Sequence, residues 1–94
     1  MTTTVRDNPE SLRYEAVHDG ELCGVIDYEI VGDAIDLQHT VVDRDRRESG
    51  VGGALVQGAL DHIRTDSSYR VIATCSFVRA FIDEHPEYAD LLER

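Results

Sequence analysis

Two short turn signals, Asp19-Gly20 and Gly32-Asp33, divide the stretch from residue 12 to residue 42 into three segments. Each signal is two residues long, and both pairs favour the positive φ angles that tight β-hairpins require. The segments alternate apolar and polar side chains, as half-buried strands do. The sequence therefore predicts three antiparallel strands in succession.

Strict alternation assigns the side chains of these strands to faces. In the third strand, one face is predicted to carry Ile35, Leu37, His39 and Val41. Thr40 and Val42 then belong to the opposite face. Gly24, within the second strand, indicates a bulge or the close approach of another backbone.

The second half of the chain has helical spacing. An apolar stripe predicts a helix over about residues 51–65, and Gly58 within it indicates close packing against the sheet. A short apolar strand follows at 69–74, which we expect to pair in parallel with the third strand through a right-handed crossover. Ser76 is expected to cap a further helix that Pro86 interrupts. These elements predict one α+β (mixed α/β) domain over residues 11–94, preceded by a flexible tail at 1–10.

The charge is strongly negative. Nineteen acidic residues oppose nine basic ones, all arginine, and the net charge is −10. Such a surface repels nucleic acids and anionic membranes, so neither is an expected partner. It suits a salt-rich cytosol, where the Debye length falls to about 3 Å at 1 M salt. A halophilic source and an arginine-favouring genome both remain open as explanations.

Metal sites, disulfides and targeting segments are not expected. Cys23 and Cys75 are too few for a disulfide framework, and no CxxC pair or His-x-x-x-His spacing indicates a metal site. The first residues have no apolar core of a signal peptide, and no apolar run is long enough to span a bilayer. We therefore expect a cytoplasmic protein with reduced thiols.

A glycine-rich loop precedes the predicted helix. Gly50, Gly52 and Gly53 would let a ligand approach the free amides of a helix N-terminus, a combination that suits a pyrophosphate. Arg46 and Arg47 add local positive charge. The alternative is a tight turn into a helix with charged residues facing solvent. A Walker A loop is excluded because the chain has no lysine.

The segment Arg47–Gly52 has the form [Q/R]-x-x-G-x-[G/A] at the start of a helix. Together with "LQHTVV" before it and "VIATCSFVRAFIDEHPEYADLL" after it, this segment resembles the very small, single-domain branch of the GCN5-related N-acetyltransferases. The resemblance covers about residues 12–92. Ala73 departs from it, because this branch usually has a proline two residues before the cysteine.

The resemblance implies an acetyl-CoA-dependent N-acetyltransferase. The third strand and the strand at 69–74 would splay apart into a V-shaped cleft for the pantetheine arm, which would bond to backbone near Val41 and Val42. The acceptor would be an amine on a small molecule or a protein, and the enzyme a monomer or weak homodimer. Further coenzyme contacts are expected along the loop, at Arg46, Arg47, Glu48, Ser49, Gly50, Val51, Gly52 and Gly53.

Cys75 and His39 are the candidate catalytic residues. Cys75 precedes a predicted helix N-terminus, which can lower the pKa of a thiol, so it is expected to contact the thioester or accept the acyl group transiently. The alternative is a buried cysteine acting as a small apolar residue. His39 is a candidate for proton handling, or else a core histidine. A non-catalytic CoA-binding module and a small interaction protein remain rival functions.

Overall fold

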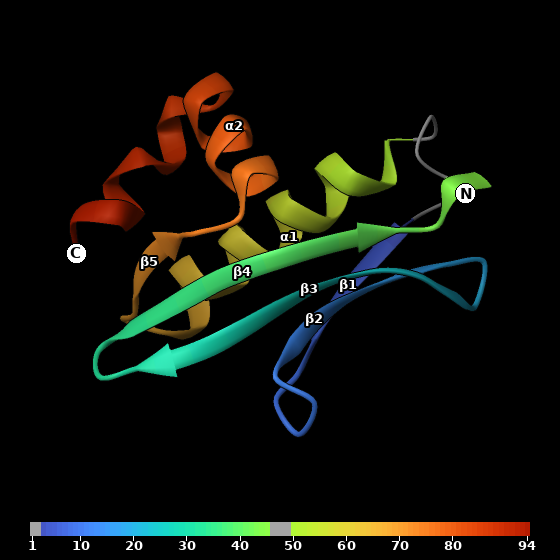
Figure 1. Cartoon of the computed structure of the whole chain (residues 1–94), viewed down its shortest axis with the longest axis horizontal. Coiled ribbons are helices and arrows are strands. Elements are labelled where there is room, and N and C mark those ends of the chain that lie inside the picture. Colours follow the sequence, from blue (N-terminus) through green and yellow to red (C-terminus); the bar gives the residue numbers. More distant parts are fainter. Residues whose placement is uncertain (1–2, 46–49) are drawn as a thin grey trace.

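A computed structural model describes residues 3–45 and 50–94 of the chain. The order of elements matches the predicted α+β class, with one additional strand at the N-terminus. Figure 1 shows the helical segments lying above the strands. In chain order the elements are β1 (Thr3–Asn8), β2 (Arg13–His18), β3 (Glu21–Val31), β4 (Ala34–Val42), α1 (Val51–Asp66), β5 (Arg70–Ala73), α2 (Ser76–Glu84) and the 3₁₀ helix η2 (Pro86–Glu93).

The five strands form a single sheet in the order β1-β2-β3-β4-β5. β1 to β4 are antiparallel neighbours, whereas β5 pairs in parallel with β4, as predicted. α1 connects β4 to β5 and so forms the crossover of the βαβ unit. Within the described ranges, no helix has the length and apolar character that crossing a membrane requires.

Both predicted hairpin turns are present. Asp19 and Gly20 have φ angles of 53° and 79°, which are the left-handed conformations of a type I′ turn. Gly32 also has a positive φ, 61°, and joins β3 to β4. These turns place the three central strands side by side, as the sequence predicts.

The prediction of a flexible tail at residues 1–10 is wrong for the described part of that segment. Residues 3–8 form β1, which pairs antiparallel along its whole length with β2. Its inward contact is with α1, since an added Cβ on Gly58 would lie 2.6 Å from the Cβ of Val5. Gly58 therefore has the packing reason expected of it, and β1 is the strand against which it packs.

Two register shifts interrupt the alternation of the sheet. Between β2 and β3 the register passes from Ala16↔Gly24 to Val17↔Leu22, so Cys23 is the extra residue of a bulge next to Gly24, as predicted. Between β3 and β4 it passes from Asp27↔His39 to Tyr28↔Leu37, so Gln38 is the extra residue. This second bulge was not predicted, and it changes the face on which every later side chain of β4 lies.

A buried carboxylate ties β1 to β2 on the face away from α1. Glu15 is 2% exposed and accepts hydrogen bonds from Arg6 and Arg13, each at 2.8 Å, and from Asn8 at 3.1 Å. These three donors outweigh the cost of burial and lower the pKa of Glu15 to about 2. The charge is therefore fully paired, as a buried charge must be to be tolerated.

The apolar core lies between the sheet and the helices. α1 buries one face of its helix against β1, β2 and β3, with Leu55, Val56 and Leu60 fully enclosed. Gly24 allows α1 to approach the sheet, since an added Cβ there would lie 3.3 Å from the Cδ2 of Leu55. This packing positions the N-terminus of α1 next to the C-terminal half of β4.

Candidate functional site

The cleft predicted between the third strand and the strand at 69–74 corresponds to the place where β4 and β5 separate. Their parallel register runs only from Ala34↔Arg70 to Leu37↔Ala73. One more backbone bond, from the Cys75 amide to the Leu37 carbonyl at 2.9 Å, closes the paired region. β4 continues to Val42, whereas the segment after β5 turns into α2. The two segments therefore diverge after Leu37.

A cavity of about 320 Å³ occupies this divergence. The described residues that line it come from three elements: Thr40 and Val42 from β4, Gly52 from α1, and Phe77 from α2. Thr40 and Val42 face inward only because the Gln38 bulge shifts the register before them. The bulge thus supplies the wall of the cavity with one hydroxyl and one apolar side chain.

The N-terminus of α1 opens onto the same cavity. Gly50 is the N-cap residue with φ 76°, and no side chain of the described residues caps the helix. The first intrahelical bond runs from the Ala54 amide to the Gly50 carbonyl, so the amides of Val51, Gly52 and Gly53 precede the hydrogen-bonded turns. Such amides, together with the helix dipole, favour an anion.

The three glycines have different structural reasons. Gly50 needs its left-handed φ, and Gly52 lies against Phe77, whose Cζ would be 2.9 Å from an added Cβ. At Gly53, by contrast, an added Cβ would meet no described atom within 4 Å. Backbone conformation explains Gly50 and packing against Phe77 explains Gly52, whereas neither reason applies to Gly53, beside which the described residues leave space for a ligand.

The loop before Gly50 is described only in part. Arg46, Arg47, Glu48 and Ser49, all expected to contact the coenzyme, lie outside the described residues. Arg44, in the described part of the loop, is exposed. It provides a cation on the chain segment that leads into the α1 N-terminus.

Cys75 lies behind the cavity wall. It is the N-cap residue of α2, in place of the expected Ser76, and it is 9% exposed. Its Sγ lies 3.3 Å from the Oγ1 of Thr40. Burial opposes ionisation of the thiol, but hydrogen bonds from Thr40 and from the backbone amides of Val78 and Phe77 outweigh it, so the pKa of Cys75 is lowered.

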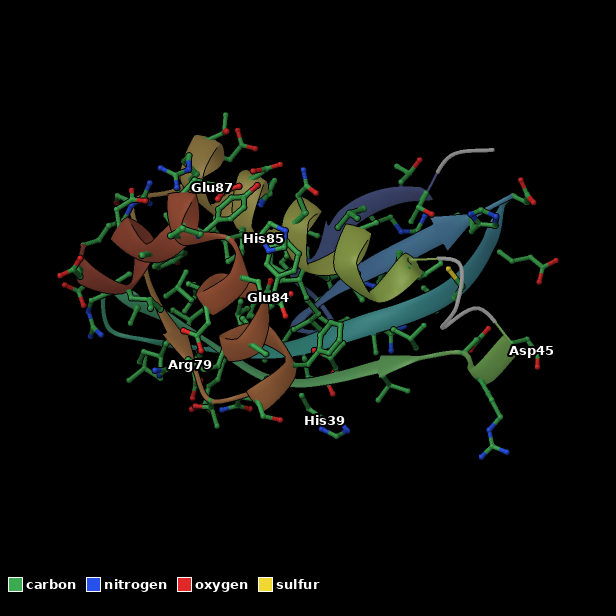
Figure 2. The ribbon with its side chains drawn as sticks, turned by 90° about the horizontal axis from the view of Figure 1, so that it is seen from above. His39, Asp45, Arg79, Glu84, His85 and Glu87 are labelled. Carbon is green, nitrogen blue, oxygen red and sulfur yellow. The ribbon has the colours of Figure 1, made fainter. Side chains whose placement is uncertain are left out.

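Strict alternation predicts that His39 shares a face with Ile35 and Leu37. This prediction is wrong. The Gln38 bulge moves the side chain of His39, and that of Val41, to the opposite face, where both are exposed. Figure 2 shows the His39 ring projecting outward beyond β4, away from the helices. Asp27 is its register partner on β3. His39 is therefore an accessible side chain next to the cleft rather than part of the core.

The remaining polar aromatic residues have structural partners. Tyr88 is 7% exposed and donates a 2.6 Å hydrogen bond to Asp61 of α1. His85 stacks on Phe81 with ring centroids 4.0 Å apart, so it packs at the end of α2. In residues 3–45 and 50–94, no three His, Cys, Asp or Glu side chains are grouped as a metal site requires.

Comparison with known proteins agrees with this geometry. A family model described as GCN5-related N-acetyl-transferase matches residues 13–91, which is most of the 94-residue chain. The matched range includes β2 to β5, both α-helices and the cleft between β4 and β5. No curated protein matches the chain.

Proposed function

The chain belongs to the GCN5-related N-acetyltransferase family, and from the geometry of its cleft we propose that it moves an acetyl group from acetyl-CoA to an amine by direct attack. Family membership supports acyl transfer in general. The donor, the acceptor and the roles of individual residues belong to the proposal. The observation that carries it is the N-terminus of α1, which no described side chain caps and whose Gly52 lines the cavity between β4 and β5.

The site fits the coenzyme in shape and in charge. The amides of Val51, Gly52 and Gly53 would hold the pyrophosphate, and the open space beside Gly53 would admit it. Arg44 provides positive charge on the same loop. The cavity between Val42 and Phe77 would take the pantetheine arm, whose apolar stretches suit these walls. Arg46 to Ser49 remain further predicted contacts.

When bound, acetyl-CoA would supply a thioester whose acyl carbon bonds to the amine nitrogen as the carbon–sulfur bond breaks. Negative charge develops on the carbonyl oxygen during this step and needs a donor. A backbone N–H near Val41 is the proposed source, because this part of β4 extends beyond the four-residue register with β5. The register of β4 with β5 ends at Leu37, the residue before the Gln38 bulge.

Cys75 is proposed as a positioning residue. Its low exposure and its place behind Thr40 favour direct transfer over an acyl-cysteine intermediate. The contact between its Sγ and the Thr40 hydroxyl orients Thr40 on the cavity wall. In this arrangement Thr40 would touch the thioester, and Cys75 would act through it.

His39 is proposed to take the proton that the amine releases, directly or through water. The acceptor must be neutral to attack, so it needs a base on the side from which it arrives. His39 lies on the exposed face of β4, one residue after the bulge that begins the divergence. Solvent reaches the same face, which allows the proton to leave.

Two measurements test the proposal against its rivals. Calorimetry with acetyl-CoA should show binding, whereas an interaction protein would show none at millimolar ligand. An assay for free CoA release across a panel of amines should then find at least one acceptor. Tight CoA binding with no turnover on any amine would instead favour a non-catalytic binding module.

A further inference from the structure

A second cavity lies at the opposite end of the sheet from the cleft. It has a volume of about 230 Å³ and lies between the C-terminus of α1 and the ends of β1, β2 and β3. Its described lining includes seven side chains that carry polar or aromatic groups: Asp7, Tyr14, Tyr28, His62, Asp66, Ser67 and Tyr69. None of the described lining residues is an arginine.

Two hydrogen-bonded pairs organise this lining. Tyr28 donates to Asp7 Oδ1 at 2.6 Å, and the Tyr14 hydroxyl lies 2.9 Å from Nδ1 of His62. The other ring nitrogen of His62 lies 3.3 Å from Asp66 on the next turn of α1. An ionised carboxylate can accept about four hydrogen bonds. Asp7 and Asp66 therefore keep acceptor capacity for a ligand.

The acidic side chains in the described lining are those of Asp7 and Asp66, which give this cavity a negative formal charge. Burial, followed by the charge of Asp7, raises the pKa of Tyr14, and Asp66 contributes in the same direction. Burial and the hydrogen bond to Asp7 likewise raise the pKa of Tyr28. Both tyrosines therefore stay neutral, while the two carboxylates remain as the local charge.

The helix end adds to this field. Asp66 is the last residue of α1, where the helix dipole is negative and disfavours an acidic side chain. The guanidinium of Arg94 donates to the carbonyl oxygens of Ser67 and Tyr69, and that of Arg64 pairs with Asp90. Both arginines are thus engaged outside the cavity lining, and Asp66, whose side chain is 59% exposed, has His62 as its described partner.

We propose that this cavity binds the ammonium group of a small aliphatic amine, at a site separate from the acyl-transfer cleft. Asp7 and Asp66 accept N–H hydrogen bonds, and the three tyrosine rings contact the charged group and its first methylenes. The volume accommodates a short alkyl chain. A diamine fits best, since its two ammonium groups match two carboxylates.

The two sites lie at different ends of β4. Ile35, near the start of β4, lines the second cavity, whereas Thr40 and Val42, near its end, line the cleft. The buried Leu37 lies between them along the strand. An amine held at the second site is therefore not the attacking acceptor, and the inference does not depend on the proposed acetyltransferase activity.

The test uses the full chain with ¹³C-labelled tyrosine rings, titrated with 1,4-diaminobutane. The ring signals of Tyr14, Tyr28 and Tyr69 should shift, and that of Tyr88, which pairs with Asp61 elsewhere, should not. The neutral 1,4-butanediol should bind at least about tenfold more weakly because it carries no charge. The same shifts from sodium chloride at equal ionic strength would overturn the proposal.

Substitution separates the carboxylates from general surface charge. The double variant Asp7→Asn and Asp66→Asn keeps the shape of both side chains and an acceptor for Tyr28, and it should weaken diamine binding about tenfold or more. Asp83→Asn removes an exposed charge from α2 and should change binding less than about twofold. Equal binding by the double variant, or saturable diamine binding that leaves the ring signals of Tyr14 and Tyr28 unchanged, would contradict a second amine site.

Discussion

The hydroxyl of Thr40 lies 3.3 Å from the Sγ of Cys75, and this contact joins β4 to the start of α2 across the base of the cleft. It exists because the extra residue Gln38 turns Thr40 to the inner face of the sheet. A regular strand would have placed His39 there instead. The bulge therefore decides which side chains of β4 line the cavity.

Replacing Cys75 tests its positioning role. Cys75→Ala removes the partner of Thr40 and should lower turnover about tenfold, whereas Cys75→Ser keeps a hydrogen-bonding group and should stay within about threefold of the wild type. Steady-state assays with acetyl-CoA and the best amine acceptor measure both. Full activity of the alanine variant would remove Cys75 from the mechanism, and an acyl adduct on Cys75 in mass spectra would replace direct transfer.

His39→Gln tests the proposed base. The substitution should lower kcat about tenfold or more, because it removes the group proposed to accept the proton of the amine. Binding of acetyl-CoA, measured by calorimetry, should be unchanged because the ring lies on the opposite face from the cavity. An unchanged kcat would assign the amine proton to another group or to water.

Gly53 and Gly58 form a matched pair within α1. Gly53→Ala should raise the free energy of unfolding by up to about 1 kcal/mol, since alanine favours the helix and its Cβ meets no described atom. The same variant should bind acetyl-CoA at least about tenfold more weakly, because the methyl group enters the space proposed for the pyrophosphate.

Gly58→Ala should have the opposite effect on stability. Its Cβ would overlap the side chain of Val5, so the free energy of unfolding should fall by about 1–3 kcal/mol. Chemical denaturation and calorimetry on both variants check the pair. A Gly53→Ala protein that is more stable and binds acetyl-CoA normally would contradict the proposed pyrophosphate site.

Glu15 should make stability depend on pH in the acidic range. Its pKa is about 2 in the folded chain against an ordinary value of 4.5, so the folded state favours the ionised form. This contribution is fully present above pH 4.5 and is lost as the pH falls from 4.5 towards 2. Glu15→Gln should cost about 1–2 kcal/mol at neutral pH and flatten that acidic decline.

Denaturant unfolding at several pH values measures this effect. Glu29→Gln is the control, since Glu29 is an exposed acidic residue on β3 of the same sheet. It should leave both the stability and its pH dependence close to those of the wild type. If the stability of Glu15→Gln still fell at low pH as that of the wild type does, a group other than Glu15 would cause the loss.

Much of the fold could be predicted because local signals determine it. The turns at Asp19-Gly20 and Gly32-Asp33, the helical stripe of α1 and the parallel pairing of β5 all follow from short-range patterns. β1 could not be recognised, because Thr3–Asn8 is mostly polar and becomes a strand only through pairing with β2. The sequence signal for this strand was Gly58, because a glycine within a helix indicates that another element packs closely against it.

The site was predicted in part. The glycine loop, the divergence of β4 from β5 and the position of Cys75 were anticipated, whereas the face of His39 was not. Alternation of side chains fails at a bulge, and nothing in "LQHTVV" marks Gln38 as the extra residue. Ser76 was predicted to cap α2, but Cys75 occupies the N-cap position and Ser76 is the first residue of the helix. Cytoplasmic location, a halophilic source and the oligomeric state remain predictions.

The most direct measurement of the central claim follows the backbone amide signals of Val51, Gly52 and Gly53 by NMR as acetyl-CoA is added. These three amides precede the hydrogen-bonded turns of α1, so binding of the pyrophosphate should give them the largest shifts in the chain. The account predicts that these shifts saturate together with those of Thr40 and Phe77. Saturable coenzyme binding that leaves the three amides unchanged would contradict it.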